Sequence, residues 1–220
     1  MPLAPTASPP SASQSQGHSQ GLEPLRLPWD LRLTPEQFER VCQANPDAVL
    51  ELAADGTLIA MTPTGGEAGA RSLRLGQRLL SWIDGPGAGA WIAFDSSTGF
   101  RLADGSVLSP DLAMVRQERW LALSPEQRRG FPPLCPDLVL ELASPSDEGP
   151  RGVTMLRQKM ALYQANGAQL GWLLLPQERT VEIWRAGQLG LAERLEEASQ
   201  LQGAELAEGL VLDLEDIWAV

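Results

Sequence analysis

The sequence predicts an α/β protein, and three observations support this class. Residues 138–142 carry apolar side chains on both faces, which is typical of a central strand in a covered sheet. Residues 34–37 (Thr-Pro-Glu-Gln) combine an N-cap, a proline at the first helical position and a capping-box glutamine, so a helix starts here. Residues 49–52 and 57–61 flank a turn at Asp55-Gly56 and predict a β-hairpin.

The remaining elements follow in chain order, read from apolar periodicity and from turn residues. We expect helices over 35–44, 67–83 and 153–166, a helix start at 124–127, strands over 90–94, 111–115, 138–142, 170–175 and 180–184, and a short C-terminal helix. Gly167 is the expected stop of the helix over 153–166, because glycine is the common residue just after a helix end.

Length and composition indicate one domain with a tail. The chain has 220 residues with 43% apolar residues, which suits a single domain over 25–220. Residues 1–24, rich in Ser, Pro and Gln, are predicted to be a disordered tail. The one histidine, His18, lies in that tail, which excludes a histidine triad, a histidine zinc site and a histidine general base from the domain.

Cysteine usage and hydropathy predict a cytoplasmic protein. Cys42 and Cys135 lie far apart without the spacing of metal ligands, so we expect two reduced thiols. No apolar run approaches the length of a membrane span, and no signal-peptide core follows Met1.

Carboxylates on apolar strands are the first candidate site residues. Asp111 opens the apolar strand over 111–115, and Glu141 lies within the strand over 138–142. An ionised carboxylate in such a place is costly unless it is paired or binds a metal. Two of them could converge on one Mg²⁺, which takes one or two protein carboxylates. The alternative is that both face solvent or pair with arginines. Glu51 is a third acid in an apolar strand, and the same two interpretations apply to it.

Lys159 is the second candidate. It is the only lysine among 17 basic residues, the others being arginine. Lysine is a compact point charge with a tunable pKa, whereas arginine is a planar fork that stays charged. A site that orients a water or neutralises one phosphate oxygen could require the former. The alternative is a solvated lysine on a helix surface, present by chance and without a function.

The charge of the chain limits how it can bind nucleic acid. A net charge of −11 argues against a broad basic surface, although a bound cation would invert the local charge of a small acidic site. Arg71, Arg74 and Arg78 recur at i, i+3 and i+7 on the helix over 67–83. Such a ridge is usually a solvated face, but it is also the best candidate for contact with the phosphates of DNA.

A set of short motifs occurs along the chain in a fixed order. These motifs are Leu50-Glu51-Leu52 with Asp55-Gly56, residues 61–66, residues 98–102, Ser109-Pro110-Asp111, residues 136–139 with Glu141, residues 144–147, Lys159 with Tyr163, and Gly171-Trp172-Leu173. Taken in this order, they resemble the Uma-type endonuclease family of the PD-(D/E)XK (restriction-endonuclease-like) nuclease superfamily. Two positions depart from the pattern. Ala143 stands where the common superfamily motif has its lysine, so the resemblance assigns that role to Lys159. Ala68 stands where such sequences often have a histidine.

The resemblance implies an α+β core with a mixed, curved sheet between helices. It also implies a Mg²⁺- or Mn²⁺-dependent hydrolase that cuts the phosphodiester bonds of DNA. Asp111 and Glu141 would bind the metal, and Lys159 would orient the attacking water or neutralise developing charge. As a further hypothesis for the catalytic set, Glu51 would complete the metal shell or hold a water. A homodimer is expected, because cutting two strands is easiest with two sites. Two alternatives stay open, a non-catalytic binding module with the nuclease fold and a structural α/β protein with solvated acids.

Overall fold

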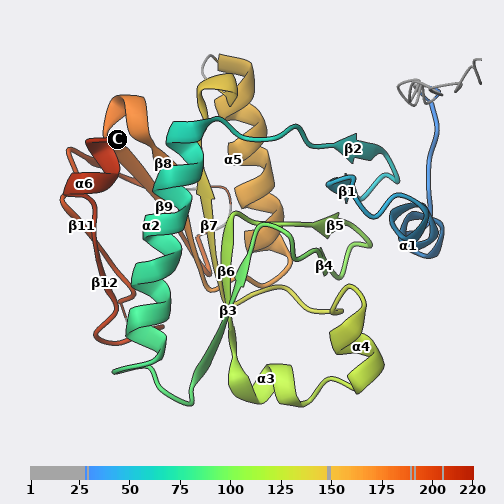
Figure 1. Cartoon of the computed structure of the whole chain (residues 1–220), viewed down its shortest axis with the longest axis horizontal. Coiled ribbons are helices and arrows are strands. Elements are labelled where there is room, and N and C mark those ends of the chain that lie inside the picture. Colours follow the sequence, from blue (N-terminus) through green and yellow to red (C-terminus); the bar gives the residue numbers. More distant parts are fainter. Residues whose placement is uncertain (1–27, 29, 148–149, 189, 191, 205) are drawn as a thin grey trace, which may run out of the picture.

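The computed structural model describes residues 28, 30–147, 150–188, 190, 192–204 and 206–220, and Figure 1 shows the whole chain. The predicted tail over 1–24 lies outside the described residues, and the domain boundary at residue 25 stays a prediction. The helices are α1 (Pro35–Ala44), α2 (Gly66–Ile83), α3 (Gln117–Leu121), α4 (Pro125–Arg129), α5 (Pro150–Ala165) and α6 (Glu215–Trp218), with the 3₁₀ turns η1 (Pro145–Asp147) and η2 (Pro176–Glu178). The strands are β1 (Leu50–Leu52), β2 (Leu58–Ala60), β3 (Trp91–Asp95), β4 (Phe100–Arg101), β5 (Val107–Leu108), β6 (Leu112–Arg116), β7 (Leu138–Leu142), β8 (Leu170–Leu175), β9 (Thr180–Arg185), β10 (Ala192–Glu196), β11 (Gln200–Gln202) and β12 (Val211–Asp213).

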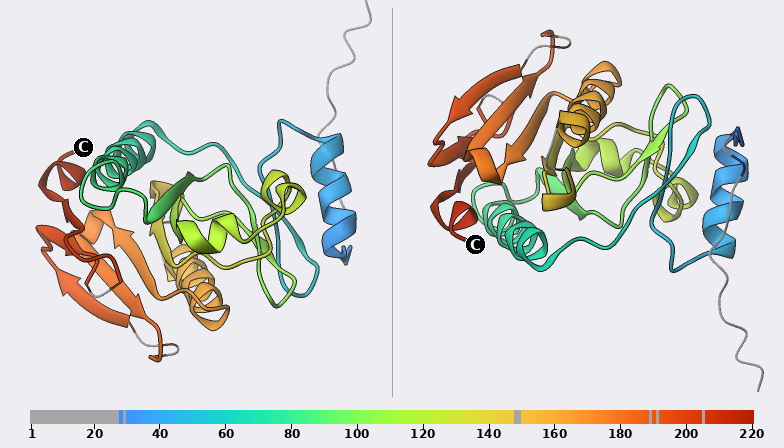
Figure 2. Two further views of the ribbon diagram at one scale, coloured as in Figure 1. Left: turned by 90° about the horizontal axis from the view of Figure 1, so that it is seen from below. Right: turned by 90° about the horizontal axis from the view of Figure 1, so that it is seen from above.

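The main sheet has six strands in the order β10-β9-β8-β7-β6-β3. β7 and β8 run parallel, and the other neighbouring pairs are antiparallel, so the sheet is mixed, as predicted. β7 and β8 are buried along their whole length because helices cover both faces of the sheet at this point. α2 lies on one face and α5 on the other (Figure 2).

Each face of the main sheet has its own apolar core. Leu75 and Leu79 of α2 pack on the face formed by residues such as Leu140 and Trp172. Met160 and Tyr163 of α5 belong to a second cluster on the opposite face, which includes the three strand residues Ala113, Val139 and Leu173. The alternation of side chains along β6 and β7 therefore decides which residues face α5.

A smaller sheet, ordered β2-β1-β5-β4, lies beside the main sheet, and α1 packs on it through Phe38. The predicted hairpin is present as β1 and β2, with Glu51 opposite Ile59. The predicted capping box of α1 is also present, with the Thr34 side chain bound to the amide of Gln37. β5 ends at Leu108 and β6 begins at Leu112, so a short linker carrying Asp111 joins the two sheets.

Two further sequence predictions concern general properties of the chain. Cys42 and Cys135 are both free thiols, as expected. Within the part of the chain that the structure describes, no helix has the length and apolar character needed to cross a bilayer.

Candidate active site

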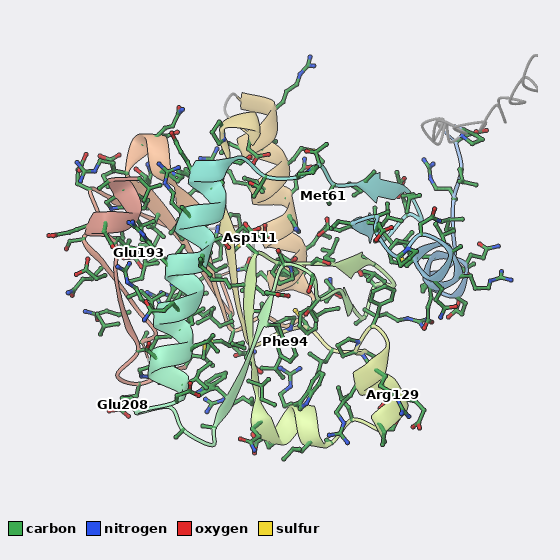
Figure 3. All side chains as sticks on the ribbon, in the orientation of Figure 1. Met61, Phe94, Asp111, Arg129, Glu193 and Glu208 are labelled. Carbon is green, nitrogen blue, oxygen red and sulfur yellow. The ribbon has the colours of Figure 1, made fainter. Side chains whose placement is uncertain are left out.

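The register of β6 and β7 places Asp111 beside Glu141. The pairing of β6 with β7 ends at Leu112 opposite Leu140, and Asp111 and Glu141 are the next residues on the two segments. Asp111 is close enough to Glu141 for its charge to raise the pKa of that acid. The backbone amide of Leu142 donates to Asp111 Oδ2 at 2.7 Å and fixes this carboxylate against β7. Figure 3 shows Asp111 in the middle of the molecule, between α2 and α5.

Lys159 reaches this point from α5. Its Nζ lies 2.9 Å from Glu141 Oε1 and 2.8 Å from Glu51 Oε1. It also donates to the backbone carbonyl of Ser109 at 2.9 Å. An ammonium group has three N–H bonds, and these contacts occupy all of them. The side chain is only 13% exposed, so these contacts form in a largely dry environment.

Glu51 enters from the small sheet. It lies on β1 and is buried, with 3% of its surface exposed. Besides the contact with Lys159, its Oε1 accepts the backbone N–H of Ser109 at 2.7 Å. The structure thus brings together Glu51, Glu141 and Lys159, which lie far apart in the sequence, and places Asp111 next to Glu141.

Tyr163 is a member of this site that the sequence analysis did not assign to it. Its hydroxyl donates to Glu141 Oε1 at 3.3 Å, and its side chain is fully buried. The Lys159 ammonium lies 5.9 Å from the centre of the Tyr163 ring. The signal in the sequence was the spacing of four residues, which stacks the two side chains on one face of α5.

The pKa values of the acids reflect their burial. Burial raises the pKa of Glu141 to about 8, although the nearby Lys159 ammonium lowers it. The pKa of Asp111 is also raised, chiefly by burial, against the opposing effects of the Leu142 amide and Lys159. Burial alone would lower the pKa of Lys159, but the carboxylates of Glu141 and Glu51 outweigh it, so the net pKa is raised and the ammonium stays charged.

The donor set fits a hard divalent cation. Glu51 and Glu141 contact the Lys159 ammonium, and Asp111 lies near enough to feel its charge. The charge of Asp147 in η1 also raises the pKa of Asp111. Buried negative charge in excess of its counter-charge favours a cation, and carboxylate oxygens are the ligands that Mg²⁺ takes. Among the described residues, no group of three or more acidic, cysteine or histidine side chains has the arrangement of a metal cluster. The assignment of Asp111 and Glu141 as the ligands of the ion stays a prediction.

The predicted arginine ridge on α2 has a different role in the structure. Arg71 is buried, with 8% of its surface exposed, and its Nε donates to the carbonyl of Ile217 at 3.0 Å. Arg74 donates to the carbonyl of Asp216 at 2.8 Å, and Arg78 binds the Asp216 carboxylate and the Asp213 carbonyl. These guanidinium groups hold α6 and its flanking residues against α2. The prediction of a solvated ridge is wrong for Arg71, because the C-terminal segment covers it, and we do not assign DNA contact to the three arginines.

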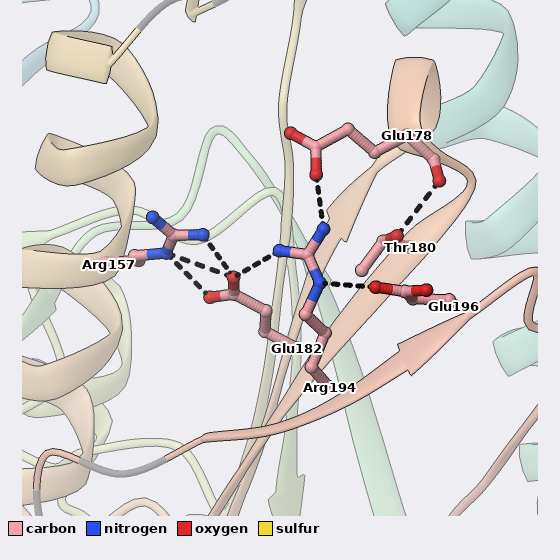
Figure 4. Close-up of polar contacts among 6 residues, drawn as sticks. All are labelled: Arg157, Glu178, Thr180, Glu182, Arg194 and Glu196. Carbon is pink, nitrogen blue, oxygen red and sulfur yellow. Dashed lines mark hydrogen bonds and ion pairs between the residues drawn. The ribbon is translucent and has the colours of Figure 1, made fainter.

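A second group of ion pairs attaches α5 to the main sheet, at a position level with Glu141 across the neighbouring strands. Glu141 lies opposite Leu173 of β8, which lies opposite Glu182 of β9. Arg157, two residues before Lys159, binds Glu182 with both Nε and Nη2, and Arg194 of β10 approaches Glu182 from the other side at 3.8 Å (Figure 4). α5 is thus attached by ion pairs on both sides of Leu173.

The chain matches one family model and several solved structures. The model of the Uma2 family, described as "Putative restriction endonuclease", matches residues 35–215. Among solved structures, a putative nuclease belonging to DUF820 from Anabaena variabilis superposes with a TM-score of 0.65 and 21% identity, over 85% of this chain and 98% of the other. This likeness confirms the predicted restriction-endonuclease-like fold. No curated protein matches the sequence.

Proposed function

This chain belongs to the Uma2 family, and on that premise we propose that it is a metal-dependent endonuclease that hydrolyses DNA phosphodiester bonds. The observation that carries the proposal is the 2.9 Å contact of the Lys159 ammonium with Glu141, the neighbour of Asp111. One ammonium on α5 and two nearby carboxylates, one on β7 and one on the linker before β6, are the groups that phosphodiester hydrolysis with a divalent cation needs.

Each residue has a proposed task. Asp111 and Glu141 would hold Mg²⁺ or Mn²⁺, which polarises the phosphate and lowers the pKa of an attacking water. Lys159 orients that water or neutralises the charge that develops on the phosphate, which is electrostatic stabilisation of the transition state. Glu51 belongs to the catalytic set through its contact with Lys159.

The test is a cleavage assay on duplex, single-stranded and branched DNA with Mg²⁺ and with Mn²⁺. We expect Asp111→Asn and Lys159→Ala each to lower the rate by about 100-fold or more. Arg129→Gln is the matched control, because Arg129 is an exposed residue whose side chain is 75% accessible and which pairs with the equally exposed Glu126. If both site variants cut DNA as fast as the parent, the site assignment is wrong.

The second candidate function is a binding module that keeps the nuclease fold without the chemistry. The net charge of −11, together with the internal role of the α2 arginines, favours it, because neither feature provides a basic surface for DNA. Calorimetric titration with Mg²⁺ combined with the cleavage assay separates the two functions. Cation binding that disappears in Glu141→Gln, without cleavage of any DNA, would identify the binding module.

Two further properties belong to this proposal. We infer a cytoplasmic location, since the chain has two free thiols and no disulfide among the described residues. We also infer a homodimer, which would present two sites to the two strands of a duplex. Light scattering of the purified protein tests the dimer, and a monomer at micromolar concentration would contradict it.

A further inference from the structure

One oxygen of Glu51 serves two donors at once. Oε1 accepts the Ser109 N–H at 2.7 Å and the Lys159 ammonium at 2.8 Å. The same ammonium donates to the Ser109 carbonyl at 2.9 Å. Carboxylate, peptide and ammonium therefore form a closed ring of three contacts. Both backbone polar groups of Ser109 are held by side chains instead of by a neighbouring strand.

This ring sets the direction of the chain into Asp111. Ser109 is followed by Pro110, whose ring fixes φ, so a held Ser109 peptide leaves little freedom before Asp111. Glu51 lies on β1 of the small sheet, whereas Lys159 lies on α5 beside the main sheet. Glu51 thus ties the small sheet to α5 across the linker that carries Asp111. A buried carboxylate that already accepts two short hydrogen bonds is costly to withdraw from them.

Glu141 differs from Glu51 in its neighbours and in its hydrogen bonds. It is the neighbour of Asp111, and its contacts with Lys159 and Tyr163 both use Oε1, the second of them long at 3.3 Å. Of the two acids on the ammonium, Glu141 is therefore the one placed to share a cation with Asp111. The three N–H bonds of Lys159 all donate to acceptors. The ammonium can therefore donate to a substrate only after one of these three hydrogen bonds breaks.

From these contacts we infer that Glu51 is a positioning residue and not a cation ligand. It keeps Lys159 and the Ser109 peptide in place, while Glu141 exchanges its contact with Lys159 for the cation. The exchange leaves one N–H of Lys159 free to donate to a water or a phosphate oxygen. This inference rests on the proposed function, because it assigns different roles to the three acids of the same site.

The single lysine of the chain makes the inference measurable. In protein labelled with ¹³C at lysine Cε, one NMR signal reports Lys159 alone. The full chain is titrated with MgCl₂ while this signal is followed, and Mg²⁺ affinity is measured by calorimetry. Hydrogen exchange of the Ser109 amide is measured without added metal. The variants are Glu51→Gln, Glu51→Ala and Glu141→Gln, with Glu36→Gln as the control, an exposed acid that pairs with Arg101 at 2.7 Å.

The expected results separate the roles of the two acids. In the parent and in Glu36→Gln, saturation with Mg²⁺ moves the Lys159 signal. Glu51→Gln keeps an acceptor oxygen but loses the charge, so it should move the Lys159 signal without metal, retain Ser109 protection and weaken Mg²⁺ binding by no more than about threefold. Glu51→Ala should lose Ser109 protection. Glu141→Gln should weaken Mg²⁺ binding by about tenfold or more.

Several outcomes would overturn the inference. Glu51 is a ligand if Glu51→Gln loses Mg²⁺ binding as fully as Glu141→Gln does. The exchange at Glu141 does not occur if the parent binds no Mg²⁺ or if its Lys159 signal stays fixed at saturation. The ring is absent if Glu51→Ala leaves the Lys159 signal and Ser109 exchange unchanged. A protein that meets every expectation but cuts no DNA would refute the proposed function alone, because none of these readouts depends on cleavage.

Discussion

Lys159 is the residue that makes a cluster of buried acids compatible with folding. Its ammonium lies within 2.9 Å of two carboxylates that are each about 4% exposed. Without it, the two buried acids would have no counter-charge, and an isolated buried carboxylate is costly to keep ionised. The site is therefore held together by the same group that would act on the substrate.

Replacing this ammonium should destabilise the protein in a pH-dependent way. Lys159→Met leaves Glu51 and Glu141 without their partner, and removing one member of a buried ion pair costs about 3–5 kcal/mol. Loss of the positive charge removes an effect that lowers the pKa of Glu141, so that pKa rises further in the folded state. Stability should then fall further as pH rises above the ordinary pKa of Glu141. Urea unfolding should show a larger loss at pH 8 than at pH 5, and an equal loss at both would contradict this account.

Sequence alone identified the charged residues of the site but not the contacts among them. Asp111, Glu141 and Glu51 stood out because they interrupt apolar strands, and Lys159 because it is unique. The role of the Ser109 peptide was not visible, since it depends on side chains from two other elements. The arginine ridge was misjudged for a related reason. Arg71 binds a carbonyl 146 residues away, and helical periodicity does not show which distant segment covers a face.

At the scale of elements, prediction succeeded where local signals were strong. The strand over 138–142 matches β7, and Gly167 ends α5 with a φ of +107°. α3 was not predicted, because it has only five residues and no side-chain cap. The leucines of α2 do not all face the core. Leu75 and Leu79 are buried, whereas Leu73 is 77% exposed.

The attachment of α5 should depend on Arg157. Its guanidinium binds Glu182, whose side chain is 6% exposed, so Arg157→Met leaves that carboxylate with the more distant Arg194, its other partner among the described residues. We expect a loss of about 1–3 kcal/mol in urea unfolding and a shift of the Lys159 NMR signal, because α5 carries both residues. Arg194→Met is the comparison, since Arg194 lies on β10 and should leave that signal in place. An unmoved signal in Arg157→Met would show that α5 is held by its apolar face alone.

The junction of η1 with α5 should be equally sensitive to a single methyl group. A Cβ added at Gly152 would lie 2.3 Å from the backbone oxygen of Asp147, and backbone has little room to move. Gly152→Ala should therefore cost about 1–3 kcal/mol and disturb Asp147 beside the site. Gly66→Ala, in the first turn of α2, has nothing within 4 Å and should be neutral or stabilising. Thermal unfolding of the two variants measures the difference, and equal melting temperatures would refute it.

At the scale of the whole molecule, the buried acids couple stability to pH. The pKa of Glu141 is raised from an ordinary 4.5 to about 8. Between these values the folded state holds a proton that the unfolded chain releases. The free energy of unfolding therefore falls as pH rises through this window and levels off above it. Asp111 is shifted in the same direction and adds to the slope.

A divalent cation should cancel much of this slope, because it stabilises the ionised carboxylates that the proton neutralises at lower pH. Unfolding of the parent from pH 5 to pH 9 should show a loss of about 1–4 kcal/mol without metal. Saturating Mg²⁺, at about 100 times its Kd, should restore about 2–3 kcal/mol near pH 8.5, and much less at pH 5.5, where protons compete for the same oxygens. Glu141→Gln should show a shallower slope and little response to Mg²⁺. A parent that gains as much from Mg²⁺ at pH 5.5 as at pH 8.5 would place the cation on surface carboxylates, away from Asp111 and Glu141.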